Sequence, residues 1–86
     1  MKKIPFLSTL KEGDSIVLDE AKNIRLDVEW GPSEEFGDSY RLDVMFCDTG
    51  AIYQFDTDCC KKGLLAILNQ EEETAKKNLV KYFEGK

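Results

Sequence analysis

The chain has 86 residues, of which 42% are hydrophobic, and its 17 acidic and 12 basic residues give a net charge of −5. This length fits a single domain spanning residues 1–86, with a core of modest size. The hydrophobic fraction is too high for a disordered chain, and no apolar run approaches the roughly 18–20 residues of a membrane span. The sequence contains no histidine, which excludes the common zinc ligand sets and every His-based catalytic triad.

The opening Met1–Phe6 has two lysines but no apolar run after them, so we expect no signal peptide and a cytoplasmic location. Residues 4–10 are mostly apolar and are interrupted by Pro5. They predict either a short edge strand or one helical turn. A polar turn over residues 11–14 leads to a first predicted strand, Asp14–Leu18, and a second polar turn covers residues 19–23.

Three further strands follow in close succession. Residues 24–30 alternate strictly: Ile24, Leu26, Val28 and Trp30 with Arg25, Asp27 and Glu29. Residues 40–47 alternate in the same way, a turn at Asp48–Gly50 follows, and residues 51–56 form the last strand. Because the connections are short, we predict an antiparallel meander of three to five strands.

The C-terminal part predicts one bent helix or two helices within residues 58–84, with Thr57 or Asp58 as the first cap and a break at Asn69–Gln70. Glu71–Glu73 would open the second helix, where acids favour the positive end of the helix dipole. The predicted fold class is α+β, with one or two helices packed on one face of the sheet. The expected core is Trp30, Leu42, Val44, Phe46, Phe55, Leu64, Leu68, Leu79 and Phe83.

The segment Asp48-Thr49-Gly50-Ala51 resembles the Asp-Thr-Gly-Ala signature of the retroviral-type aspartic proteases, which act as homodimers that bring two carboxylates together. The resemblance covers these four residues and their flanks. The family's flap hairpin and its later apolar-apolar-Gly strand have no counterpart in the residues after Ala51. We therefore interpret the segment as a hairpin turn.

Two other segments suggest chemistry. Asp56-Thr57-Asp58 opens like a calcium loop, but the required glycine and glutamate are replaced by Lys61 and Ile67, so we expect no metal there. Cys59 and Cys60 would have a lowered pKa if they began a helix, which is the basis for a redox role. An odd number of cysteines without a Cys-x-x-Cys motif instead favours reduced thiols, two of them part of the core. We expect neither a cofactor nor a catalytic residue.

The position of the charges is the most informative functional feature. Residues 12–58 hold thirteen acidic and three basic residues, a net charge of −10, and most of this block is predicted sheet. A fixed negative surface attracts cationic partners and repels phosphate. The predicted partner-binding residues are those of the outward strand positions and of an eight-residue loop, Gly31–Asp38, which we call the Phe36 loop: Asp27, Glu29, Asp43, Glu34, Glu35, Phe36 and Asp38.

These features predict a non-enzymatic binding protein whose partner is a basic protein, such as a nuclease or another nucleic-acid enzyme. Phe36 would be a hot-spot anchor with acids around it, unless it folds back onto the core and the acids serve solubility. In general character the chain resembles the small acidic anti-defence proteins of phages, such as anti-CRISPR proteins, and bacterial immunity proteins. That likeness implies an inhibitor that imitates nucleic-acid charge.

Two alternatives remain open from the sequence. The lysine-rich helices predict a nucleic-acid-associated module, while an enzyme would need a deep pocket around Asp48 or Cys59. A homodimer is also possible, formed either through a patch of Met45, Cys47 and Ile52 or through an uncovered edge strand.

Overall fold

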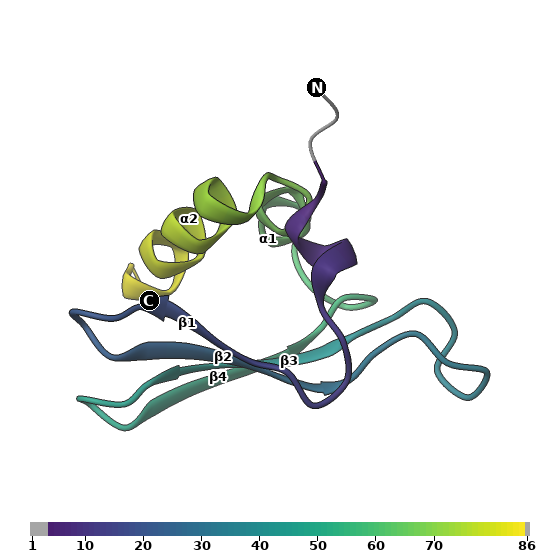
Figure 1. Cartoon of the computed structure of the whole chain (residues 1–86), viewed down its shortest axis with the longest axis horizontal. Coiled ribbons are helices and arrows are strands. Elements are labelled where there is room, and N and C mark those ends of the chain that lie inside the picture. The colour runs from purple at the N-terminus through teal and green to yellow at the C-terminus, as the bar shows by residue number, and fades with distance from the viewer. Residues whose placement is uncertain (1–3, 86) are drawn as a thin grey trace.

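Four strands pair in sequence order to form one antiparallel sheet, and two helices follow them (Figure 1). The computed structural model describes residues 4–85, so the basic opening Met1–Lys3 lies outside the described residues. This architecture confirms the predicted α+β meander and fixes the number of strands at four. The elements in chain order are η1 (Phe6–Thr9), β1 (Ser15–Asp19), β2 (Ile24–Trp30), β3 (Arg41–Phe46), β4 (Ala51–Asp56), α1 (Lys62–Leu68) and α2 (Glu72–Glu84).

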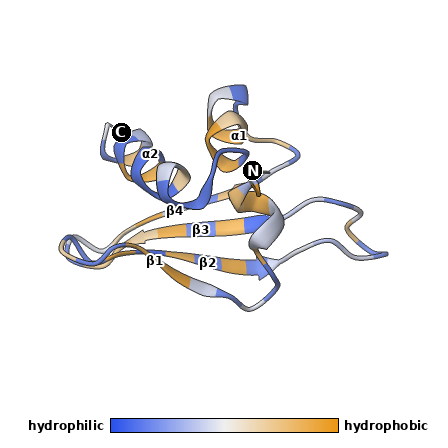
Figure 2. Cartoon of the chain, turned by 45° about the horizontal axis from the view of Figure 1, so that its top comes forward, coloured by the Kyte–Doolittle hydropathy of each residue, from blue (hydrophilic) through white to orange (hydrophobic). Residues whose placement is uncertain are grey.

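The alternating strands place one set of side chains between the sheet and the helices, as predicted. Leu26, Leu42 and Val44 are fully buried, and Leu68 and Leu79 reach the same core from α1 and α2. Both helices lie on one face of the sheet, and the described residues leave the other face open (Figure 2). Within residues 4–85, neither helix combines the length and the apolar character that crossing a membrane requires.

One member of the expected core, Trp30, lies outside it. The register of β2 with β3 shifts between Val28 and Trp30, so Trp30 pairs with Arg41, an open-face residue. A bulge of this kind adds one residue and breaks the alternation on which the prediction rested. The position opposite Tyr40 is taken by Gly31, where a Cβ atom would lie 3.4 Å from the Tyr40 ring. Phe46 and Phe55, also expected in the core, are partly buried against it.

The predicted start of the first helix is wrong. Thr57 continues the pairing of β3 with β4, because its N–H donates to the Tyr40 carbonyl and its Oγ1 accepts from the Tyr40 N–H, both at 2.9 Å. The helix α1 begins only at Lys62, and Lys61 at its N-cap makes no capping bond through its side chain. The break at Asn69–Gln70 is confirmed and separates two helices. In α2, Glu72 and Lys76 form an ion pair one turn apart at 3.2 Å.

The N-terminal segment, which the sequence left undecided, is a helical turn of the 3₁₀ type. Its Phe6 side chain is fully buried, and its Phe6 N–H donates to the Gln70 carbonyl at 2.8 Å. This bond ties the segment to the junction between α1 and α2. The segment therefore completes the core beside the helices, as its position above the sheet in Figure 1 shows.

We predict that Phe6→Ala lowers the free energy of unfolding by roughly 3–5 kcal/mol, the usual effect of truncating a buried aromatic side chain. Ile4→Ala is the control, because Ile4 is 64% exposed, and it should change stability by less than about 0.5 kcal/mol. Urea denaturation of both variants measures the difference. Equal, small effects would show that the segment does not contribute to the core.

Candidate functional site

Four carboxylates lie on the open face of the sheet, and we call them together the acidic face: Asp27, Glu29, Asp43 and Asp56. The first three were predicted from alternation. Asp56 was considered only as the start of a calcium-loop motif and as the end of the last strand. Side chains alternate between the two faces of a strand, so Asp56 lies on the same face of β4 as Ile52 and Gln54. This alternation was the sequence signal that could have placed Asp56 on the open face.

Asp27 and Asp43 lie directly opposite each other in the pairing of β2 with β3. Both side chains are half-buried, and in each the Oδ1 atom is shielded from water without a hydrogen-bond partner. Like charges in this arrangement repel each other and destabilise a sheet. The two carboxylates therefore form a negative centre. Within the described part of the chain, no donor bonds to the Oδ1 atom of either one.

Glu29 is the extra residue of the bulge, and its carboxyl group meets that of Asp43. The hydrogen bond with Asp43 raises the pKa of Glu29 above its ordinary value, and burial and the charge of Asp43 raise it further. The charge of Arg41 and a hydrogen bond from Gln54 act in the opposite direction without reversing the shift. Two carboxyl groups that share a site in this way resist full ionisation.

Arg41 is the base that lies among these acids. Its Nε is 3.4 Å from Glu29 Oε2 and 3.7 Å from Asp56 Oδ1, and its Nη2 donates to Gln54 Oε1 at 2.7 Å. The two carboxylate contacts are ion pairs without hydrogen-bond geometry, since Arg41 Nε and Asp56 Oδ1 both lack a hydrogen-bond partner. Arg25 lies on the same face and donates to Ser15 Oγ, so two guanidinium groups and four carboxylates leave the surface negative.

An aromatic pair continues the open face beyond Arg41. The rings of Trp30 and Phe36 stack with their centroids 4.1 Å apart and an angle of 13° between their planes. Phe36 therefore neither folds onto the core nor stands alone, and its side chain stays 39% exposed. The bulge makes this contact possible, because it keeps Trp30 out of the core.

The Phe36 loop extends past the end of the strands (Figure 1) and has internal order. Ser33 and Gly37 exchange two backbone hydrogen bonds of 2.8 Å, and Gly37 has a φ of 69°, which favours glycine. The Ser33 hydroxyl accepts from the Phe36 N–H, while buried Ser39 donates its hydroxyl to the Phe36 carbonyl. The three predicted loop acids are exposed around this frame: Glu34, Glu35 and Asp38.

The first segment considered for chemistry lies in the turn that follows β3. Asp48–Gly50 is an exposed turn between β3 and β4, in which the Thr49 and Gly50 N–H groups both donate to the Phe46 carbonyl. This geometry supports the turn interpretation. Among residues 4–85 there is no group of three or more acidic or cysteine side chains that could hold a metal ion.

The structure does not support the redox alternative at Cys60, and the prediction that two cysteines belong to the core is wrong, since Cys47 and Cys59 are exposed and Cys60 is only partly buried. All three cysteines are free thiols, and α1 begins two residues after Cys60. Burial, as the largest influence, raises the pKa of Cys60, whose thiol donates to the Thr57 carbonyl at 3.4 Å. A raised pKa leaves less of the reactive thiolate at neutral pH.

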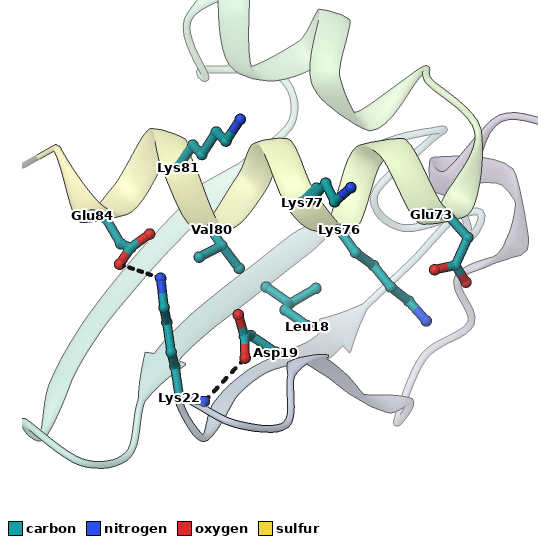
Figure 3. A pocket seen from close by; sticks show the side chains of 9 residues that line it. All are labelled: Leu18, Asp19, Lys22, Glu73, Lys76, Lys77, Val80, Lys81 and Glu84. Carbon is teal, nitrogen blue, oxygen red and sulfur yellow. Dashed lines mark hydrogen bonds and ion pairs between the residues drawn. The ribbon is translucent and has the colours of Figure 1, made fainter.

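A cavity of about 340 Å³ lies on the other side of the sheet, between α2 and the turn that joins β1 to β2 (Figure 3). Leu18 and Val80 line its apolar part, and four lysines with three acids surround them. Lys22 Nζ donates to Glu84 at 2.9 Å, an interaction that raises the pKa of Lys22. Neither this cavity nor a smaller one beside Gln70 is lined by Asp48 or Cys59.

The chain matches no model of a known protein family, and neither the curated proteins nor the solved structures include a significant match to it. The acidic face and the aromatic pair are therefore the features that indicate a function.

We predict that Asp43→Asn lowers the pKa of Glu29 toward its ordinary value of 4.5, because the variant removes the charge and alters the hydrogen bond that raise it. A pH titration followed by NMR of the side-chain carboxyl carbons measures the change. Asp58→Asn, at an exposed position away from the acidic face, should leave the pKa of Glu29 unchanged. An equal pKa in the wild type and Asp43→Asn would contradict the arrangement.

The same shift predicts a dependence of stability on pH. The folded state holds the Glu29 proton more tightly than the unfolded state, so this contribution to stability is complete below pH 4.5 and is lost as the pH rises through the raised pKa. Glu29→Gln does not titrate. Its free energy of unfolding relative to the wild type should therefore increase from pH 4 toward pH 7 in urea denaturation. A constant difference would contradict this prediction.

Proposed function

We propose that this protein is a non-enzymatic binding module that docks its acidic face and Phe36 loop onto a basic surface of another protein. The most concrete form is an inhibitor that occupies the phosphate-binding surface of a nuclease or a similar nucleic-acid enzyme. The observation that carries the proposal is the row of carboxylates on one open sheet face, which ends in a partly exposed aromatic stack.

The rigidity of the charges supports electrostatic imitation. The backbone fixes where these side chains begin, because neighbouring strands lie about 5 Å apart and alternate residues of a regular strand lie about 7 Å apart along it. Such a surface requires little ordering when it binds, so less of the interaction energy is lost. Arginine and lysine side chains that bind closely spaced phosphates meet a comparable density of negative charge here.

The unsatisfied oxygen atoms give this surface binding capacity. Asp27 and Asp43 each keep a shielded oxygen without a hydrogen-bond partner, and Asp56 has a third. Charged donors from a partner would satisfy these carboxylates once the side chains rotate the shielded oxygens toward the surface, and charge-assisted hydrogen bonds are about twice as strong as neutral ones. They would also offset the repulsion between Asp27 and Asp43, so binding would relieve a cost present in the free protein.

The aromatic pair supplies an apolar contact beside the charges. Phe36 presents its exposed ring surface at the loop while Trp30 supports its other side. Aromatic residues at the edge of a charged patch are common anchors of protein interfaces, and their rings also attract arginine. A partner surface rich in arginine therefore fits both parts of the site.

The lysines of α2 give a weaker alternative, a nucleic-acid-associated module. Four lysines surround the cavity in Figure 3, but Lys22 is paired with Glu84, and Lys76 is paired with Glu72. Phosphate would have to displace these carboxylates, which lowers the electrostatic gain on binding. The acidic face carries the stronger case.

A double substitution, Asp27→Lys with Glu29→Lys, should abolish binding to the basic partner while the protein stays folded. The matched control is Glu20→Lys with Asp58→Lys, which changes the net charge equally at exposed acids outside the acidic face. The wild type and both variants are immobilised in turn, exposed to lysate of the source cell and washed with increasing salt. Retained proteins are identified by mass spectrometry.

A basic nucleic-acid enzyme that the wild type and the control retain at low salt and release at high salt would support the proposal. Equal retention by the Asp27→Lys, Glu29→Lys variant would show that the acidic face serves solubility. Retention of nucleic acid itself would favour the alternative.

We further predict that Phe36→Ala weakens binding to that partner by about 2 kcal/mol, or roughly 30-fold, as is typical of a hot spot. Ile4→Ala is the control, because it truncates an exposed apolar side chain outside the acidic face and the Phe36 loop. Calorimetry with the purified partner measures both variants. If Phe36→Ala binds as tightly as the wild type, the aromatic pair is not part of the interface.

A further inference from the structure

The two edge strands of the sheet differ in how well they are protected from pairing. The strand order β1-β2-β3-β4 leaves β1 and β4 at the edges of the described sheet. Edge strands carry unpaired N–H and C=O groups that can pair with another strand, and proteins commonly block them with bulges, lysines, prolines or a covering element.

The edge at β1 has such protection. Its register with β2 shifts between Val17 and Asp19, which disrupts a regular ladder. The helix α2 lies beside its end, where Leu18 and Val80 line one cavity (Figure 3). The ion pair of Lys22 with Glu84 joins the following turn to α2. A second strand would meet an irregular and partly covered edge.

Within residues 4–85, the edge at β4 has none of these devices. Its six residues, Ala51–Asp56, pair with β3 in an unbroken register and include neither lysine nor proline. Their β-branched and aromatic residues favour strands, and the one charge lies at the end. Ile52 is 63% exposed. The strand is therefore long, regular and nearly uncharged.

The hydrogen bonds at the end of β4 determine which of its groups point outward. The Thr57 N–H donates to the Tyr40 carbonyl, so Thr57 faces β3. Because the pattern alternates in an antiparallel pair, Phe55 and Tyr53 also face β3. The backbone groups of Ile52, Gln54 and Asp56 then point away from the sheet, at regular intervals.

We propose that two copies of the chain pair through β4 in an antiparallel arrangement, with the two-fold axis at Gln54. Gln54 then lies opposite Gln54 of the second copy, and Ile52 lies opposite Asp56. This register uses all three outward-facing residues of each strand. If the register shifted by one residue, backbone N–H and C=O groups that point outward from one copy would face residues of the other copy whose groups point toward β3. The hydrogen-bonding pattern therefore specifies the register.

Charge does not prevent this pairing. The two Asp56 carboxylates lie four residues apart along the strands, about 14 Å at 3.4 Å per residue. That separation exceeds the screening length of about 8 Å at physiological salt. The axis is perpendicular to the sheet, so both acidic faces lie on the same side. The dimer has one continuous eight-stranded sheet, and this assembly does not depend on the proposed function.

The first test uses the wild-type protein under reducing conditions, which prevents disulfides between exposed thiols. Sedimentation measures its mass across a range of concentrations, and NMR follows amide hydrogen exchange. We expect a dimer, with exchange at Ile52, Gln54 and Asp56 slowing as the concentration rises, while Ser15 and Val17 at the other edge do not change. A monomer at every soluble concentration, or protection of Ser15 and Val17 instead, would overturn the proposal.

The second test addresses the register. Relative to Ile52→Gln, Ile52→Glu places one acid opposite each of the two Asp56 residues and should weaken the dimer roughly 2- to 30-fold, while Ile52→Lys should strengthen it by a similar factor. Val17→Glu and Val17→Lys make the same changes of net charge at the β1 edge and should have little effect. Equal effects at both edges, or the opposite order at Ile52, would overturn the two-fold pairing about Gln54.

Discussion

The β-bulge between Val28 and Trp30 decides what the open face of the sheet presents. Without the extra residue, Trp30 would follow Leu26 and Val28 into the core, and Phe36 would have no ring to stack on. The bulge also brings Glu29 to the carboxyl group of Asp43. One irregularity in β2 thus produces both the aromatic pair and the densest part of the acidic face.

Folding brings these acids together at an energetic cost. Asp27 opposes Asp43 across the strands, and the pKa of Glu29 is raised because its neighbour is also an acid. The apolar face of the same strands holds them in register, and Arg41 reduces the repulsion from within the cluster. A cationic partner would reduce it further, so the stability of the free protein and its affinity for a partner would be linked through the same carboxylates.

Much of the fold could be predicted from alternation. The strands 24–30 and 51–56 have the predicted bounds, and the break at Asn69–Gln70 is present. The alternation of apolar and polar residues does not reveal a bulge, because it assumes a regular strand. Trp30 was assigned to the core for this reason. Local capping signals failed at Thr57, because a tertiary bond to Tyr40 extends the sheet pairing to that residue.

The candidate site could be predicted in part. Alternation places Asp27 and Asp43 on the open face, as expected, and the loop acids are exposed. The stacking of Phe36 on Trp30 could not be anticipated, since it requires the bulge and the fold of the loop together. The roles of Arg41 and Gln54 were also missed, because they depend on distances between neighbouring strands rather than on sequence spacing.

The most direct test of a docking role for the acidic face is to map the contact surface on the protein itself. The purified basic partner is titrated into ¹⁵N-labelled protein, and the amide signals are followed by NMR. Our account predicts that the signals that shift or broaden first belong to residues 25–30, 34–38 and 41–43, while those of α2 change little. Changes confined to α1 and α2 would contradict it, because the lysine-bearing side would then be the binding surface.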